Sequence, residues 1–300
     1  MDARAVTPEE IAAFYEKHLP GDDFLELNAD NFRQFFLEYD AFRYKGGHYD
    51  YIPALLKSMD LEGKDVLEIG PGQGADGQKI IELGGIYTAL DLTQESIKRL
   101  KTRFELFGLK YKKLYVMNAE EMTLPDESFD IVYSHGVLLT SPRIEKIVHH
   151  IFRVLKKGGR AVIMLYHKNS LNYHVSIKVI RRTGIFLLLI PFVDRIVSKL
   201  TDEPLARLNK HKANLKANGL SYLKMDNFIH KATDGPENVY TSVWTKKMCD
   251  QLFSRFSEIR YEARFINERH FPIIMKLIPR TLKEKIEKKW GWNLYITVTK

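Results

Sequence analysis

The sequence predicts an α/β fold, a doubly wound parallel sheet with helical cap insertions. Strand-like apolar runs alternate with helical stripes between residues 64 and 166, and a glycine-rich turn follows the first strand. Such alternation is typical of parallel sheets. The 300 residues exceed one compact α/β unit without reaching two full domains, so one core with insertions is expected.

Residues 1–62 are expected to form an N-terminal helical cap. Thr7-Pro8-Glu9-Glu10 supplies a capping residue, a proline in the first turn and an acid three residues after the cap, which predicts a helix to about His18 that ends before Pro20-Gly21. A second helix is expected over residues 31–42, where an aromatic stripe indicates packing rather than ligand contact. A third is expected over residues 51–58.

Residues 63–168 are expected to form the α/β core. The predicted strands are residues 64–69, 86–92, 111–117, 129–136 and 160–166. Helices are predicted over residues 75–83, from Thr93 to a glycine cap at Gly108, and from Ser141 to Gly158-Gly159.

The alternation stops after His167. Residues 169–243 show helical and loop character without a convincing strand and are interpreted as an inserted helical cap. The core is expected to end in residues 244–300, with a helix over 245–256 and strands over 259–265 and 294–299. A basic insertion, residues 267–292, separates these two strands.

The run from Val66 to Gly77, VLEIGPGQGADG, carries the most informative motif. Glycine is needed where the backbone turns with positive φ, or where a ligand lies against the main chain. Such a loop is typical of nucleotide-like ligands. The same glycines also satisfy the G-x-G-x-x-G pattern, so they alone leave a dinucleotide as an alternative.

Two acids favour a cationic ligand. Glu68 lies at the carboxyl end of the first strand, where its carboxylate would repel a pyrophosphate but attract the amino and sulfonium groups of S-adenosylmethionine. Asp91 ends the second strand, at about the spacing expected of a ribose-binding acid. Its alternative role is to place a negative charge at the N-terminus of the next helix.

The E-x-G-x-G-x-G loop together with Asp91 resembles the first two motifs of class I S-adenosylmethionine-dependent methyltransferases. Residues 119–142, AEEMTLPDESFDIVYSHGVLLTSP, and residues 151–173, IFRVLKKGGRAVIMLYHKNSLNY, look like later motifs of the broad group that includes quinone-ring methylases. The resemblance implies a Rossmann-like seven-stranded sheet with an antiparallel last strand. It also implies S-adenosylmethionine as the cofactor and S-adenosylhomocysteine as the product.

The resemblance places the cofactor at the carboxyl ends of the strands, where doubly wound sheets bind ligands. The glycine loop would pass beneath the methionine part, Glu68 would lie near its amino group, and Asp91 would bind both ribose hydroxyls. Many relatives carry an aspartate at the position of Asn118, whose amide could still accept from adenine. The expected cofactor-binding residues are Glu68, Gly70, Gly72, Gln73, Gly74, Asp91, Leu92, Asn118, Ala119, Glu120, Ser134 and His135.

Methyl transfer is an in-line displacement at a carbon that the sulfonium activates, so the protein mainly supplies alignment and desolvation. A general base is required only when the accepting atom is protonated. His135 is the first candidate for a base or a positioning group, and a structural histidine is the alternative. Tyr166 and His167 are second candidates, and Tyr44 and His48 are third.

The expected acceptor is a small molecule or a lipid-like compound, methylated on O, N, S or C. Relatives often have a histidine pair where this chain has Leu138-Leu139, and an apolar acceptor pocket is one interpretation of that difference. The alternatives are an RNA or protein methyltransferase, an NAD(P)-dependent oxidoreductase and a non-catalytic cofactor-binding scaffold. No nucleic-acid module signature is recognised, so no nucleic-acid partner is expected. No carboxylate cluster can be placed, so no metal is expected.

The formal net charge of +8 fits a nucleic acid, a membrane surface, an anionic substrate or only a well-solvated surface. Cys249 is the only cysteine, which excludes an intrachain disulfide and a zinc cluster. The first residues lack the apolar core of a signal peptide, and no apolar run reaches the roughly 20 residues of a membrane span. A cytoplasmic protein is therefore expected.

Two segments are candidates for peripheral membrane contact. Residues 184–193, GIFLLLIPFV, are apolar and flanked by basic residues. Residues 281–290 begin with a Thr-x-x-Glu capping box and combine Leu282, Ile286 and Trp290 with lysines, which would suit an anionic lipid interface. The alternatives are that both segments cover the active-site mouth or form a homodimer contact.

Overall fold

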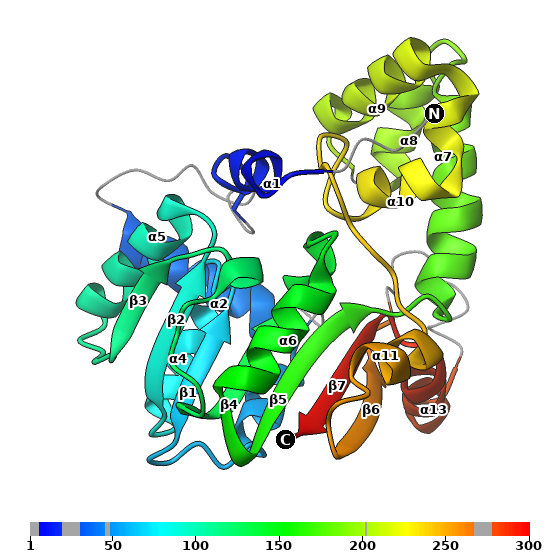
Figure 1. Cartoon of the computed structure of the whole chain (residues 1–300). Coiled ribbons are helices and arrows are strands. Elements are labelled where there is room, and N and C mark those ends of the chain that lie inside the picture. Colours follow the sequence, from blue (N-terminus) through cyan, green and yellow to red (C-terminus); the bar gives the residue numbers. More distant parts are fainter. Residues whose placement is uncertain (1–5, 20–30, 46–48, 202, 267–277) are drawn as a thin grey trace. The chain divides into compact units, whose positions relative to one another are not determined.

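The computed structural model of the chain describes residues 6–19, 31–45, 49–201, 203–266 and 278–300 (Figure 1). His48 and the Pro20-Gly21 pair lie outside these ranges. The chain divides into two compact units. We call residues 1–165, 246–262 and 295–300 the core unit, and residues 166–245 and 263–294 the helical unit.

Within the described residues, seven strands form one sheet in the order β3-β2-β1-β4-β5-β7-β6. Their bounds are β1 Asp65–Ile69, β2 Ile86–Asp91, β3 Lys113–Val116, β4 Phe129–His135, β5 Leu155–Tyr166, β6 Glu258–Arg264 and β7 Asn293–Thr299. Strands β1 to β5 pair in parallel. Backbone hydrogen bonds join residues 158 and 300, and residues 167 and 292, so β7 runs antiparallel to β5. The predicted doubly wound sheet with an antiparallel last strand is confirmed.

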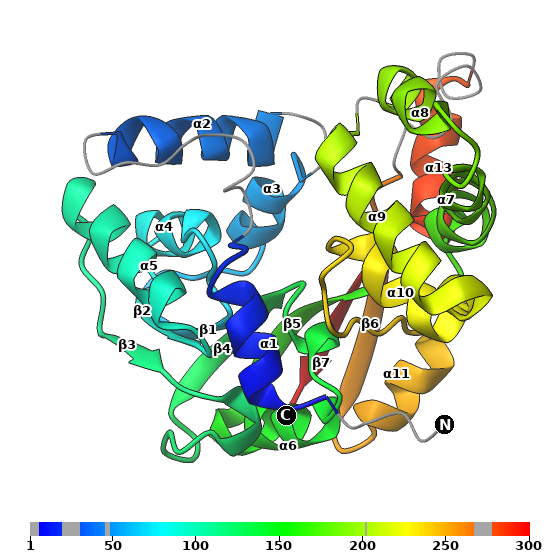
Figure 2. The ribbon, with the colours of Figure 1, turned by 90° about the horizontal axis from the view of Figure 1, so that it is seen from above.

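Helices cover both faces of the sheet. Figures 1 and 2 show α4 (Ala75–Glu82) and α5 (Gln94–Leu106) on one face, and α6 (Ile144–Val154) and α11 (Lys246–Leu252) on the other. The N-terminal helices are α1 (Pro8–Tyr15), α2 (Phe32–Lys45) and α3 (Ile52–Lys57). Helix α2 packs against α4 and α5, and α3 packs against α4. The predicted capping box is present, since Thr7 and Glu10 exchange side-chain to backbone hydrogen bonds.

Two predictions about α6 were wrong. The helix begins at Ile144 rather than near Ser141, and it ends at Val154 rather than at the glycine pair. Strand β5 starts directly afterwards, so Gly158-Gly159 lies inside a strand, next to an irregularity in the β4 to β5 register. A Cβ at Gly159 would press on three backbone oxygens, which explains glycine there without any helix end.

The helical unit contains the expected helical insertion. Its elements within residues 169–243 are the π-helix η3 (Asn172–Arg181), α7 (Arg182–Leu187), α8 (Val193–Thr201), α9 (Leu205–Asn218), the 3-10 helix η4 (Gly219–Leu223) and α10 (Met225–Thr233). They surround a core that includes Ile177, Leu188 and Phe228. Within the ranges the structure describes, no helix combines the length and apolar character needed to cross a bilayer.

The later basic insertion contributes α13 (Arg280–Trp290) to the same unit. The prediction of a capping box at Thr281 was wrong. The helix begins one residue earlier, at Arg280, and its N-cap residue, Pro279, provides no side-chain hydrogen bond. Glu284 instead pairs with Arg280 on the helix surface.

Candidate functional site

The candidate site lies where β1 and β4 run side by side. These strands are neighbours although β2 and β3 separate them in sequence, which makes this the switch point of the sheet and the usual ligand position in such folds. Glu68 pairs in register with Tyr133 near the carboxyl ends of the two strands. The Ser134 hydroxyl donates to the carbonyl of Ile69 at 2.9 Å and ties the two ends together.

The glycine loop turns with positive φ at Gly70, Gly72 and Gly74, at +74°, +53° and +76°. Protein atoms explain two of them, because a Cβ at Gly70 would overlap Val137 and a Cβ at Gly74 would overlap Leu100. At Gly72, no described atom lies within 4 Å of the position that a Cβ would occupy. The backbone at Gly72 is therefore the part of the loop that a ligand can approach closely.

Glu68 is a buried carboxylate, 2% exposed, beside this loop. It accepts a hydrogen bond from the Tyr87 hydroxyl, and no described lysine or arginine forms an ion pair with it. Burial raises the pKa of Glu68 to about 8, with a further contribution from the negative charge of Asp76. A buried acid without a cationic partner either stays protonated or receives a cation from outside.

Asp76, in the first turn of α4, has the partners that Glu68 lacks. Arg43 of α2 donates from Nε at 2.8 Å and from Nη2 at 2.5 Å, and the hydroxyls of Tyr44 and Tyr133 donate at 2.7 and 2.8 Å. Burial alone would raise the pKa of Asp76, but Arg43 and these hydrogen bonds hold it below its ordinary value. Burial also raises the pKa of the Tyr44 hydroxyl, so this third catalytic candidate supports Asp76 as a neutral donor.

The sequence analysis did not identify the contacts between Asp76 and Arg43. From the sequence alone, Asp76 is an acid that complements the helix dipole, and Arg43 is an ordinary basic residue at the end of an aromatic helix. Only tertiary packing of α2 on α4 brings the two together.

His135 ends β4 and lies half-buried between aromatic rings and Arg43. The ring centroids of Tyr49 and His135 lie 4.9 Å apart with the two ring planes at right angles. Arg43 Nη2 lies 3.4 Å from Nδ1 of His135. Because an arginine can only donate, Nδ1 accepts and the proton belongs on Nε2. No described residue accepts a hydrogen bond from Nε2. Burial, and then the charge of Arg43, lowers the pKa of His135 to about 3.

Asp91 ends β2 and occupies the N-terminus of α5. Its Oδ1 accepts from the backbone and hydroxyl of Thr93 at 2.9 and 2.7 Å, and its Oδ2 accepts from Ser96 at 2.9 Å. The Ser96 hydroxyl is also 3.2 Å from the carbonyl of Gly72, so it links Asp91 to the glycine loop. These hydrogen bonds place the Asp91 carboxylate beside the first turn of α5, and Leu92 follows half-buried. Burial raises the pKa of Asp91.

The expected adenine edge, residues 118–120, forms the start of the 3-10 helix η1 (Ala119–Glu121). The side-chain oxygen of Asn118 already accepts from the Glu120 backbone at 2.9 Å. The buried carboxylate of Glu120 accepts from Ser141 and from Arg143, both at 2.6 Å. Both Glu120 oxygens thus bind the segment before α6, which leaves backbone rather than this carboxylate for a ligand.

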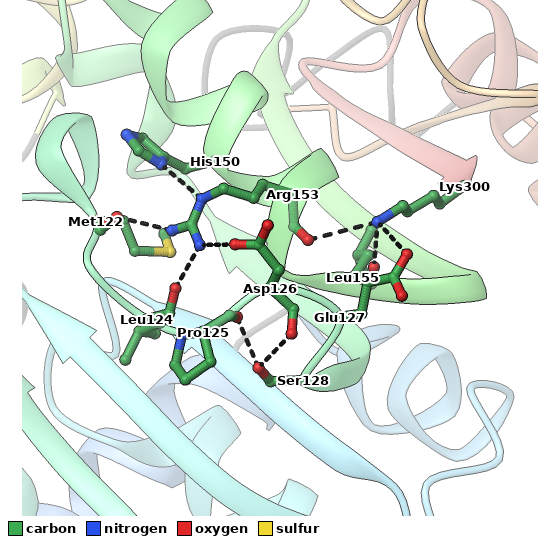
Figure 3. Close-up of polar contacts among 10 residues, drawn as sticks. All are labelled: Met122, Leu124, Pro125, Asp126, Glu127, Ser128, His150, Arg153, Leu155 and Lys300. Carbon is green, nitrogen blue, oxygen red and sulfur yellow. Dashed lines mark hydrogen bonds and ion pairs between the residues drawn. The ribbon is translucent and has the colours of Figure 1, made fainter.

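Figure 3 shows how Arg153 of α6 fixes the loop after η1. Its guanidinium donates to the carbonyls of Met122 at 2.8 Å and Leu124 at 2.5 Å and forms an ion pair with Asp126. The Nζ atom of Lys300 forms an ion pair with Oε1 of the neighbouring Glu127 at 3.4 Å. This clamp holds the chain that leads from η1 to β4.

The remaining expected residues have structural partners. Gln73 is buried, and its carbonyl accepts from Arg103 at 3.3 Å. Tyr166 and His167 belong to the helical unit: Tyr166 stacks on Trp292 with ring centroids 4.4 Å apart, and His167 is 3.1 Å from the carbonyl of Gly291. Among the described residues, no three His, Cys, Asp or Glu side chains gather as a metal site.

Comparisons with known proteins agree with this geometry. Residues 67–163 match the family model described as a methyltransferase domain. Phosphatidylethanolamine N-methyltransferase of Cereibacter sphaeroides is 33% identical over 107 residues, which cover 35% of this chain and 52% of that protein. Phthiotriol/phenolphthiotriol dimycocerosates methyltransferase of Mycobacterium tuberculosis is 35% identical over 103 residues, which cover 34% and 37%. The chain thus spans about half of the first relative and little more than a third of the second.

Among solved structures, the [4+2]-cyclase SpnF is similar over nearly the whole chain. The match covers 99% of this chain and 97% of that one, with a TM-score of 0.53 and 12% identity. At that identity the likeness concerns the fold alone. Because this neighbour is described as a cyclase, the fold by itself does not determine the reaction.

Proposed function

We propose, from the class I S-adenosylmethionine-dependent methyltransferase domain that this chain contains, that the protein transfers a methyl group to O, N, S or C of a lipid-like or small-molecule acceptor. The observation that carries the proposal is the buried carboxylate of Glu68, which forms no ion pair with a described side chain, beside the open backbone of Gly72. A ligand with an amino group and a sulfonium supplies the missing positive charge. A diphosphate would add negative charge beside Glu68 and Asp76.

The chain's own residues fit this cofactor. Glu68 would bind the amino group, while the loop Gly70, Gly72, Gln73 and Gly74 would lie against the methionine part. Asp91 would accept from the ribose hydroxyls, since a carboxylate oxygen accepts more than one hydrogen bond. Leu92, Asn118, Ala119, Glu120 and Ser134 would complete the cofactor site. Bound there, S-adenosylmethionine would supply a methyl carbon activated by the adjacent sulfonium.

His135 is proposed as a positioning residue. A neutral ring whose Nε2–H faces no described acceptor can donate to a carboxylate or carbonyl oxygen of a ligand. Replacing it with glutamine keeps a donor near that position, whereas phenylalanine removes it. We expect His135→Gln to retain S-adenosylhomocysteine affinity within a few-fold and His135→Phe to lose about tenfold. Equal losses in both variants would remove this role. Tyr166, His167 and His48 stay predictions.

The lipid-like acceptor is supported by the relatives, one of which is named for phosphatidylethanolamine. Many relatives have a histidine pair where this chain has Leu138 and Leu139. This difference also favours an acceptor other than the one that those relatives methylate. Both leucines are fully buried in the 3-10 helix η2 (Leu138–Thr140), directly after the strand that carries His135.

The test measures binding and turnover separately. Calorimetry with S-adenosylhomocysteine and with NAD(H) tests the cofactor, and binding of NAD(H) alone would overturn the proposal. Transfer of a labelled methyl group to phosphatidylethanolamine vesicles, free fatty acids, sterols and quinols tests the acceptor. Tight cofactor binding without transfer to any acceptor would favour the non-catalytic scaffold. Methyl transfer to RNA or protein, and not to these compounds, would show that the acceptor is a macromolecule rather than a lipid-like or small molecule.

A further inference from the structure

The segment from residue 179 to residue 200 leaves an unusual amount of apolar surface in water. Nine large apolar side chains are exposed within it, more than in the rest of the described chain together. They are Val179, Ile180, Phe186, Leu187, Leu189, Ile190, Phe192, Ile196 and Leu200. We call these nine side chains the apolar tip. Exposed apolar patches of this kind mark interaction sites.

The local fold explains why the apolar tip faces outward. Ile185 and Leu188 are buried in the core of the helical unit, so that their apolar neighbours lie on the opposite side of α7 and its following turn. Phe192, in that turn, has a φ of +66° and is 69% exposed. In α8, Ile196 and Leu200 are four residues apart and therefore share one exposed face.

Basic side chains border the apolar tip. Lys178, Arg195 and Lys199 are exposed, Arg182 is half-buried, and the Arg195 guanidinium lies 6.0 Å from the centre of the Phe192 ring. The only acid between residues 178 and 200 is Asp194, whose carboxylate forms an ion pair with Lys212 at 3.0 Å. The border is therefore positively charged.

The positive border favours an anionic bilayer over a second copy of the chain as the partner of the apolar tip. In a two-fold dimer the same patch would meet itself, which brings one positive border against another. An anionic bilayer instead offers apolar depth for the apolar tip and negative headgroups for its border. Helix α13 is a weaker candidate, because it exposes only Leu282 and Trp290 and carries Glu284 and Glu287 among its lysines.

We propose that the apolar tip is a docking surface for an anionic lipid bilayer, on which the protein lies without crossing it. This inference goes beyond methyl transfer and does not depend on it. It specifies the surface, the partner and the forces: burial of apolar side chains in the interface, and attraction between the basic border and anionic headgroups.

The experiment measures sedimentation of the full chain with vesicles of phosphatidylcholine, with and without phosphatidylglycerol. We expect binding only to the anionic vesicles at low salt, and weakening at high salt. Phe192→Asp/Leu200→Asp and Arg195→Gln/Lys199→Gln should each weaken binding at least tenfold. Leu220→Asp is the matched control, because Leu220 is 68% exposed in the same unit but outside the apolar tip.

Absence of binding to anionic vesicles at low salt would overturn the proposal, as would equal losses in the control and in both double variants. Analytical ultracentrifugation distinguishes the other occupant: a dimer that Phe192→Asp/Leu200→Asp converts to monomer, without vesicle binding, would assign the surface to self-association. S-adenosylhomocysteine affinity, measured on the same variants, should stay unchanged. It therefore separates failure of docking from failure of the methyltransferase proposal.

Discussion

Affinity for S-adenosylhomocysteine should rise steeply with pH, because Glu68 must ionise to bind its amino group. In the free protein, burial and the charge of Asp76 raise the pKa of this carboxyl to about 8, so at pH 6 nearly every molecule holds the proton. A bound ammonium group favours the ionised carboxylate and lowers its pKa. Ligand binding therefore releases a proton wherever the pH lies between the two pKa values.

The magnitude follows from the two pKa values. If the pKa of Glu68 falls from about 8 to its ordinary 4.5 on binding, affinity increases about fiftyfold between pH 6 and pH 8. Isothermal titration calorimetry measures this rise. Titrations at pH 7 in two buffers with different ionisation enthalpies should reveal the release of nearly one proton.

Two variants complete this experiment. Glu68→Gln should bind weakly with a flat pH profile, while Glu105→Gln, at an exposed acid of α5, should behave like the wild type. Relative to Glu68→Gln, the free wild type should lose stability as pH rises from about 4.5 to 8, because the unfolded chain releases a proton that folded Glu68 retains. Groups common to both proteins, such as His135, cancel in this difference, which separates weak binding from misfolding. An affinity that is constant from pH 6 to pH 8 would refute the reasoning.

Three further variants test the surrounding network. Asp76→Asn leaves Arg43 beside Glu68 without its anionic partner, so the midpoint of the calorimetric pH profile should move below 8, and an unchanged midpoint would contradict the coupling. Asp91→Ala should weaken S-adenosylhomocysteine binding at least tenfold, about 1.4 kcal/mol, in a calorimetric titration checked against the melting temperature; unchanged affinity would remove Asp91 from the ribose. Arg153→Met should cost about 1–3 kcal/mol of unfolding free energy in urea titrations, because it leaves two carbonyls without their donor. Urea curves that superimpose would show that the clamp contributes nothing.

Local patterns predicted the fold well because the signals were short-range. The Thr7 capping box, the Thr93 cap of α5 and the strand before the glycine loop each depend on residues within a few positions. The Gly158-Gly159 pair was misread for the same reason. A glycine pair after a helical stripe is typical of a helix end, whereas here a close approach to the β4 backbone requires it.

The candidate site was predictable only in part. Glu68 and the loop glycines follow from the motif, but the pairing of Arg43 with Asp76 depends on the packing of α2 against α4, and no spacing in the sequence encodes it. His135 was recognised as a candidate, yet its neutral state comes from burial and from the charge of Arg43, and its donor role comes from its contact with Arg43, a residue 92 positions earlier. Exposure of the apolar tip was equally hidden, because an apolar run alone does not reveal which side chains the core buries.

The electrostatics of the site follow from two buried acids, of which only Asp76 is paired with Arg43. Arg43 is bidentate to Asp76, which keeps that carboxylate ionised, and the same negative charge then discourages ionisation of Glu68. When no ligand is bound, Glu68 and Asp76 can both be ionised only at a high desolvation cost. An external cation beside Glu68 lets this second carboxylate ionise with its charge compensated, whereas a diphosphate would add uncompensated negative charge beside Asp76. The proposed preference for a cationic nucleoside thus arises from the pairing of Arg43 with Asp76, not from the glycine loop, which both kinds of ligand can approach.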